Sequence, residues 1–252
     1  MVNAMSAWQW QVRRFEEIDS TNTYLKERAR EGAPEGLVAV ADHQTAGRGR
    51  LHRRWESPPG ANLLVSLLLR PECDPDDLHL CTTAVALAAA DACREVAGVD
   101  VSFKWPNDLL VGESKLAGIL AEVEFAGGTP PGVVVGIGIN VAWPGPPEAG
   151  GTCLEEVSGS AQSVDRKVLL DHLLYALAPR REMLDDARGR RVLADEVRSR
   201  CSTLGQRVRV LLADEEVTGV AHGIDGSGRL VIETETGLRT VTAGDVVHLR
   251  PC

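Results

Sequence analysis

Three short apolar runs limit the possible folds of this chain more than any other feature. They lie at 37–41, 62–69 and 133–140, and each is bounded by polar or glycine-rich segments. A continuous apolar run of this length is typical of a buried strand. Two longer segments, 74–97 and 163–177, carry apolar residues at helical spacing. The sequence therefore predicts a sheet with helices packed on it.

Shorter elements are expected between these runs. We expect an edge strand over 8–15, a helix over 22–31, strands over 101–104, 109–111 and 115–125, a Pro/Gly loop over 143–151 and a helix over 192–201. Asp19-Ser20-Thr21-Asn22 offers several residues that can cap the first helix. Pro179 is expected to kink or end the helix that begins near Ser163.

The hydrophobic period changes near Gly205. Short strands joined by glycine-containing turns follow, and we expect them at 207–212, 217–224, 229–234, 238–242 and 246–249. Short strands in this arrangement favour a small barrel, which closes its own edges. We therefore expect two domains, a catalytic domain over 1–204 and a C-terminal barrel over 205–252.

Composition and charge exclude several classes of protein. The 252 residues carry a net charge of −9, which argues against a general nucleic-acid binder. The most apolar window, 78–96, contains His79, Asp91 and Arg94, so it predicts a packed helix instead of a membrane span. Residues 1–11 lack the apolar core of a signal peptide. Six cysteines form no C-x-x-C pair and no zinc spacing, which favours reduced thiols in a cytoplasmic protein.

The segment 42–55 opposes the acidic average of the chain. Its cationic residues are Arg48, Arg50, Arg53 and Arg54, and glycine stands at positions 47 and 49. Arginine presents a planar fork of donors that matches phosphate or carboxylate, and glycine lets a ligand approach the backbone closely. The segment predicts a loop that closes over a polyanion, although a solvated surface explains it equally well by itself. No G-x-x-x-x-G-K-[ST] motif lies near it, so it is not a P-loop.

Three further segments carry polar residues beside predicted strands. Lys104-Trp105-Pro106-Asn107-Asp108 is a rigid corner, because proline disfavours helix before it and Asn and Asp favour a turn. Lys115 begins a strand of small and apolar residues, where by itself it is best interpreted as a rim residue. Gly136 and Gly138 make only a weak dinucleotide signal, but they allow close packing beneath a ligand, and Asn140 follows them.

Taken together, five segments resemble the biotin–protein ligase family, in its short form without an N-terminal DNA-binding domain. They are 19–22, 44–50 with Trp55, 104–108, 115–120 and 136–140, in the family's order and spacing. The resemblance implies an α+β fold. Its first part is a mixed, largely antiparallel sheet with helices on one side, as in class II synthetase-like catalytic domains. An SH3-like barrel follows, so the resemblance covers nearly the whole chain.

The resemblance also implies a reaction and its partners. Biotin is activated by ATP to biotinyl-5′-AMP, and biotin is then transferred to a specific lysine of a biotin carboxyl carrier protein, a domain of a biotin-dependent carboxylase. ATP enters as its Mg²⁺ complex, biotin is the second substrate, and no tightly bound cofactor is expected. No partner among nucleic acids or membranes is expected, and the family allows a homodimer.

Matching positions carry the family's roles onto this sequence. Lys115, Arg48 and Arg50 are the expected catalytic residues, with Lys115 bridging the biotin carboxylate and the α-phosphate. The expected biotin-binding residues are Ser20, Thr21, Asn22, Gln44, Gly47, Arg48, Gly49, Lys115 and Gly118. The expected ATP- and adenylate-binding residues are Arg48, Arg50, Arg53, Trp55, Lys104, Asn107, Asp108, Lys115 and Asn140. Asp108 is the expected Mg²⁺ ligand. The family often has glycine where this chain has His52, and the bulkier residue is expected to restrict the loop.

Other functions were weighed against this one. Lipoate ligases and octanoyl transferases resemble the same fold, but Ser20, Thr21 and Gln44 suit a ureido ring, and no cysteine falls in the five segments. A biotin or nucleotide sensor without enzymatic activity is disfavoured by the acidic charge. An inactive scaffold would not need both lysines and the loop arginines.

Overall fold

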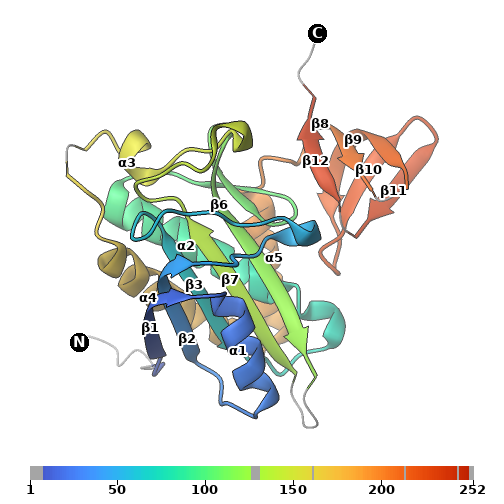
Figure 1. Cartoon of the computed structure of the whole chain (residues 1–252). Coiled ribbons are helices and arrows are strands. Elements are labelled where there is room, and N and C mark those ends of the chain that lie inside the picture. The colour runs from blue at the N-terminus through green and yellow to red at the C-terminus, as the bar shows by residue number, and fades with distance from the viewer. Residues whose placement is uncertain (1–7, 126–130, 161, 213, 243, 250–252) are drawn as a thin grey trace, which may run out of the picture.

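The computed structural model describes residues 8–125, 131–160, 162–212, 214–242 and 244–249. Within them the chain forms a seven-stranded sheet covered by helices and, beside it, a five-stranded C-terminal sheet (Figure 1). This α+β arrangement confirms the expected fold class. None of the described helices is long and apolar enough to cross a membrane.

The large sheet has the strand order β1-β2-β3-β7-β6-β5-β4. Its strands are β1 (Gln11–Ile18), β2 (Leu37–Gln44), β3 (Leu63–Leu69), β4 (Ser102–Lys104), β5 (Asp108–Val111), β6 (Ser114–Glu124) and β7 (Gly132–Ile139). Only β1 and β2 pair in parallel, and every other neighbouring pair is antiparallel. The sheet is therefore mixed and largely antiparallel, as expected, with β1 at an edge.

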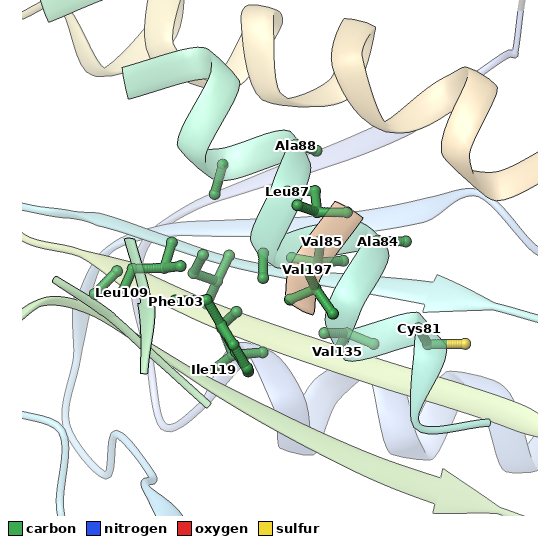
Figure 2. Packing of buried hydrophobic residues seen from close by; sticks show 14 of the residues in the cluster. Cys81, Ala84, Val85, Leu87, Ala88, Phe103, Leu109, Ile119, Val135 and Val197 are labelled. Carbon is green, nitrogen blue, oxygen red and sulfur yellow. The ribbon is translucent and has the colours of Figure 1, made fainter. Parts of the chain in front are cut away.

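Helices cover both faces of this sheet. They are α1 (Thr21–Arg30), α2 (Leu80–Ala97), the short α3 (Leu154–Val157), α4 (Arg166–Met183) and α5 (Ala187–Ser199). The helix α2 packs between the sheet and α4, and its alanines permit this close approach. Figure 2 shows Ala84, Val85 and Ala88 of α2 near Val135 of β7 and Ile119 of β6, in one buried cluster.

The helix α1 lies on the opposite face, so the expected placement of all helices on one side is wrong. Its Leu25 and Ala29 join Ala39, Leu68 and Val134 in a second buried cluster. Neighbouring residues of a strand point to opposite faces. Because β3 and β7 are buried at every position, both faces of the sheet need a cover.

Two helix boundaries also differ from expectation, and for α4 it is the expected end at Pro179 that is wrong. The helix α4 continues through Pro179 to Met183; Leu177 and Arg181 on either side of the proline are buried, so packing outweighs the lost hydrogen bond. The helix expected from residue 74 is divided into a 3₁₀ turn over Pro75–Asp77 and α2. The helix α3 was not predicted.

The C-terminal sheet has the order β11-β10-β9-β8-β12 and is antiparallel throughout. Its strands are β8 (Arg207–Leu211), β9 (Glu216–Ile224), β10 (Leu230–Thr234), β11 (Gly237–Val241) and β12 (Asp245–His248), close to the predicted ranges. No ladder joins β11 to β12 among the described residues, so hydrogen bonding does not close a complete barrel there. The domain boundary at 204/205 stays a prediction.

Specific contacts attach this sheet to the larger one. The indole Nε1 of Trp105 donates a hydrogen bond of 2.9 Å to the carbonyl oxygen of Gly228. Arg198 Nε of α5 donates a hydrogen bond to the carbonyl oxygen of Ile224, also at 2.9 Å. These bonds hold the segment between β9 and β10 against the corner that contains Trp105 and against α5.

Candidate active site

A cavity of about 760 Å³ lies between the start of α1, the strands β6 and β7, the arginine loop (residues 47–55) and a wall formed by residues 144–151. All but one of the predicted site residues line it. They are Ser20, Thr21, Asn22, Gln44, Arg48, Gly49, Arg50, Arg53, Trp55, Lys104, Asn107, Asp108, Lys115, Gly118 and Asn140. The exception, Gly47, lines a neighbouring cavity. The structure thus brings together residues from five distant segments.

Neutral polar groups form one end of this cavity. Ser20 caps α1, and its side chain accepts from the backbone N–H of Thr23. Gln44 Oε1 accepts from the backbone N–H of Thr21 at 2.8 Å and lies 3.0 Å from Thr21 Oγ1. Because its oxygen is engaged in this way, Gln44 presents its Nε2 donors to the cavity.

Asn22 belongs to the same neutral end, and three other residues set its orientation. Its Oδ1 accepts from Ser66 Oγ at 2.6 Å, and Ser66 Oγ lies 2.7 Å from Thr21 Oγ1. Its Nδ2 donates to the carbonyl oxygen of Leu120 at 3.2 Å. A Cβ on Gly136 would lie 2.0 Å from Asn22 Oδ1, so this strand position must be glycine. Sequence reasoning missed Ser66, whose signal was a hydroxyl inside an apolar run.

The arginine loop folds as a small hairpin beside the other end. Gly49 N–H donates to Arg53 O at 2.8 Å, and Trp55 N–H donates to Gly47 O at 3.0 Å. A Cβ on Gly47 would lie 2.3 Å from Trp55 O, so glycine lets the two arms meet. Leu51, at the tip, has φ 53° and is 60% exposed.

Each predicted arginine of this loop has a partner from another segment. Arg48 Nη1 lies 3.1 Å from Glu122 Oε1, and Arg50 Nη1 donates to Asn107 Oδ1 at 2.9 Å. Arg53 pairs with Asp245, which brings the loop onto the C-terminal sheet (Figure 1). The loop is therefore docked at the cavity and is not simply a solvated surface.

Burial makes Arg50 the most desolvated of these cations. That burial lowers its pKa from the ordinary value, while Asp245 and Asp108 act in the opposite direction. Arginine stays protonated in proteins. A cation that is poorly hydrated and held by a neutral amide favours an incoming anion, because the anion restores the lost solvation.

Lys115 lies between the two ends, at the start of β6. Its Nζ is 2.6 Å from Asp108 Oδ1 and 5.6 Å from the centre of a Trp55 ring. Its backbone is held by the cavity wall, because Thr152 N–H donates to Lys115 O at 2.9 Å. An ammonium group in this position can bind anions that enter from either end.

Trp55 covers the floor of the cavity. A Cβ on Gly138 would lie 2.4 Å from the indole Cε2, and a Cβ on Gly118 would lie 2.9 Å from Cζ3. The indole Nε1 is buried without a hydrogen-bond partner in the described structure. The glycines thus let the indole of Trp55 pack against β6 and β7, whereas the sequence predicted close packing beneath a ligand at Gly136 and Gly138.

The corner at 104–108 forms the far side of the charged end. Asn107 Nδ2 donates to the carbonyl oxygen of Ile119 at 2.7 Å, which leaves its Oδ1 to accept from Arg50. Lys104 and Asp108 are paired residues of β4 and β5. The corner therefore supplies an ammonium group, an amide and a carboxylate to one side of the cavity.

Asn140 has a structural task that its sequence position did not reveal. Its Nδ2 donates to the carbonyl oxygens of Pro144 and Thr152, each at 3.0 Å, and its Oδ1 accepts from Asn62 Nδ2 at 3.2 Å. These bonds hold the wall at 144–151 in place. Its predicted contact with adenosine stays a prediction.

No described cysteine lines this cavity. Burial raises the pKa of Cys93 to about 12 and also raises the pKa of Cys201. Thiols of this kind are poor nucleophiles, which agrees with the sequence argument against cysteine acyl transfer.

Comparison with known proteins shows the family of this chain. Residues 14–140 match the model of the Biotin/lipoate A/B protein ligase family, and residues 203–249 match the Biotin protein ligase C terminal domain. The biotin--[acetyl-CoA-carboxylase] ligase of Mycobacterium tuberculosis is 36% identical over 99% of this chain and 93% of its own length.

Two further similarities point the same way. The bifunctional ligase/repressor BirA of Bacillus subtilis is 33% identical, over 91% of this chain and 71% of its own length. The structure of a biotin protein ligase from Aquifex aeolicus in complex with biotin and ATP has a TM-score of 0.79 and 30% identity, and covers 96% of this chain and 99% of that one. The chain therefore belongs to the biotin/lipoate A/B protein ligase family, as a biotin protein ligase.

Proposed function

We propose that this protein is an ATP-dependent biotin–[biotin carboxyl carrier protein] ligase. One observation carries the proposal: a single cavity joins a neutral hydrogen-bonding end to a cationic end, with Lys115 between them. Such a cavity suits a neutral ring whose carboxylate meets a nucleotide. The relative from Mycobacterium tuberculosis is a biotin ligase by name, and the Aquifex aeolicus structure contains biotin and ATP.

The neutral end is the proposed ureido site. A ureido oxygen needs donors and its N–H groups need acceptors. Gln44 presents donors, while the hydroxyls of Ser20 and Thr21 serve in either sense. Gly118 and the backbone of Gly49 lie where the rest of biotin extends towards Lys115.

The first chemical step joins two anions. A carboxylate oxygen of biotin forms a bond to the α-phosphorus of ATP, the bond from that phosphorus to the bridging oxygen breaks, and pyrophosphate leaves. Lys115 binds the carboxylate and the α-phosphate together. To do so, its ammonium group loses the ion pair with Asp108, whose carboxylate remains in the charged end of the cavity. Fixed cations of this kind stabilise the charge that develops on the transferring phosphoryl group.

The charged end is the proposed nucleotide site. Arg48, Arg50 and Arg53 bind phosphates, Lys104 and Asn107 line the same side, and Trp55 offers an aromatic face to the base. Asn140 contributes the wall behind it.

Mg²⁺ enters as part of the ATP complex, with Asp108 as its proposed protein ligand. No group of three or more His, Cys, Asp or Glu that could hold a metal occurs in the described part of the chain. One carboxylate beside a phosphate site fits Mg²⁺, which usually binds through one or two carboxylates plus substrate phosphates. When bound, the ion neutralises phosphate charge.

The second step transfers biotin to the acceptor. The neutral amine of an acceptor lysine attacks the acyl carbon, a C–N bond forms, the C–O bond to phosphate breaks, AMP leaves and the nitrogen loses a proton. Water would attack the same carbon, so the arginine loop has to cover the adenylate between the steps.

We also infer that residues 1–204 form the catalytic domain and 205–252 the C-terminal one. We infer that the enzyme acts in the cytoplasm, with no nucleic acid or membrane as partner. A homodimer is compatible with the position of β1 at the end of the described strand order.

A transfer assay tests this function. The full chain is incubated with ATP, Mg²⁺ and a purified biotin carboxyl carrier domain, with biotin or lipoate supplied in parallel. Mass spectrometry should show one added biotin on a single lysine and no added lipoate. Attachment of lipoate, or no attachment of biotin, would contradict the proposal.

A further inference from the structure

Glu122 of β6 lies just outside the cavity, yet its carboxylate holds two residues that line it. Asn22 Nδ2 donates to Glu122 Oε2 at 3.0 Å, and Arg48 Nη1 lies 3.1 Å from Oε1. Lys26 Nζ lies 2.7 Å from Oε1. Three donors, two from α1 and one from the arginine loop, therefore converge on one carboxylate. The side chain of Glu122 is only 16% exposed.

Glu122 remains ionised in this environment. Burial opposes its ionisation, but the hydrogen bonds from Lys26 and Asn22, together with the nearby charge of Arg48, outweigh burial and lower its pKa below the ordinary value. Hydrogen bonds to an ionised acceptor are about twice as strong as those between neutral groups. The carboxylate therefore holds its donors more firmly than a neutral amide would.

The two cavity residues that meet here have different origins. Asn22 begins α1 and is bound on its other side by Ser66. Arg48 belongs to the first arm of the arginine loop, and its side chain is 45% exposed. Glu122 is the protein anion that ties this loop arm to the floor of the cavity. Without it, solvent would compete freely for the Arg48 guanidinium.

We propose that Glu122 is a positioning residue for biotin: it clamps the first arm of the arginine loop to Asn22 and so shapes the neutral end of the cavity. Glu122 itself touches no substrate. The inference rests on the proposed function, because it assigns the neutral end to biotin.

Glu124 provides a matched control on the same strand. It shares Lys26 with Glu122, at 3.4 Å, and pairs with Arg30 Nε at 2.8 Å. Its side chain is similarly covered, at 12% exposed. Among the contacts of the described residues, none joins Glu124 to Asn22 or Arg48. Glu124→Gln thus removes a comparable ion pair without touching the cavity.

The experiment compares Glu122→Gln and Glu124→Gln in the full chain. Calorimetry with biotin alone gives the dissociation constant, pyrophosphate release gives KM for biotin and for ATP, and thermal unfolding reports stability. Glu122→Gln should raise the dissociation constant and KM for biotin about tenfold, the loss expected for charge-assisted hydrogen bonds. Its KM for ATP should rise by less than its KM for biotin, because only Arg48 loses its partner, while Arg50 and Arg53 keep theirs at the charged end. Every constant of Glu124→Gln should change less than about twofold.

Equal biotin affinity in the two variants would overturn the inference, as would an equal rise in KM for biotin and for ATP. If Glu122→Gln does not fold, Glu122→Asp takes its place. It keeps the charge but shortens the side chain, so weaker biotin binding is expected and unchanged binding would overturn the inference.

The proposed function fails separately, when the unmodified protein binds biotin but neither releases pyrophosphate nor labels the carrier domain. An unmodified protein that does not bind biotin would overturn both.

Discussion

The two ends of the cavity are built in opposite ways. At the neutral end, Thr21, Asn22 and Ser66 are buried and hydrogen-bonded to one another. At the charged end, the side chains of Arg50 and Lys115 each have a resident partner that a ligand can replace. The neutral end is ready to receive a ring without reorganisation, which favours affinity. The charged end exchanges internal partners for the carboxylate and phosphates of its substrates.

This difference predicts which residues determine biotin affinity and which determine the rate of the chemical step. Changes at the neutral end should weaken biotin binding and leave ATP binding intact. Changes at the charged end should affect the chemical step and the retention of the adenylate. The four variants below test this division, from the largest expected effect to the smallest.

Replacing Lys115 with alanine should abolish adenylate formation. The expected loss in the rate of pyrophosphate release is about a thousandfold, comparable to removing a group that stabilises charge in the transition state. The fold should persist, because the Lys115 side chain is 33% exposed and its ion pair with Asp108 is partly solvated. Thermal unfolding checks the fold, and near-normal pyrophosphate release would contradict the assigned role.

Gly138→Ala should disturb both ends together. The new Cβ would lie 2.4 Å from the Trp55 indole, so the ring has to leave the floor of the cavity. We expect affinity for biotin and for ATP to fall together, by about tenfold or more, because clashes in a packed site are costly. Gly223→Ala is the control, since a Cβ there meets nothing within 4 Å. Normal binding by Gly138→Ala would show that the indole does not need this floor.

Arg50→Gly should make the adenylate leak. Loss of the Arg50–Asn107 hydrogen bond loosens the loop over the intermediate. We expect biotinyl-5′-AMP to dissociate about tenfold faster, because the free energy of one charge-assisted hydrogen bond is lost. The released adenylate should then biotinylate bystander lysines. Arg54→Gly makes the same change in the same loop, but among the described residues the Arg54 side chain donates to the carbonyl oxygen of Thr45 in that same loop region. No increase in released adenylate over that control would contradict the proposed role.

Thr21→Val should have the smallest effect of the four. The change keeps the shape of the side chain and removes the hydroxyl that contacts Gln44 and Ser66. We expect KM for biotin to rise about fivefold, as for the loss of a neutral hydrogen bond, with KM for ATP unchanged. Steady-state kinetics with each substrate varied in turn measure both constants. A rise confined to ATP would reverse the assignment of the two ends.

Local sequence patterns predicted the elements, and the family resemblance named residues that line the cavity. Apolar runs gave the central strands of the large sheet, and short strands with turns gave the C-terminal sheet. The five segments that resemble the family met in one place, because each lies at a strand end or a helix start that faces the same cavity. Each segment by itself had another interpretation, so it was their order and spacing together that indicated the site.

The remaining features depend on contacts between distant residues, which one sequence does not reveal. Glu122 and Asn22 are 100 positions apart, and Asp245 reaches Arg53 from the other sheet. Asn62 and Asn140 form an amide pair across β3 and β7, and this pair supports the cavity wall. Single polar residues of this kind give no periodic signal, so their partners became visible only in the fold.

Adenylation without an acceptor tests the central claim most directly. The full chain is mixed with ATP and Mg²⁺, biotin or lipoate is added in parallel, and pyrophosphate is measured over the first turnover. The account predicts a burst of about one equivalent per chain with biotin, followed by a slow phase as the adenylate is retained, and no burst with lipoate. A burst with lipoate would contradict the ureido assignment of the neutral end. If neither acid gives a burst although calorimetry shows biotin binding, the proposed ligase activity would be contradicted.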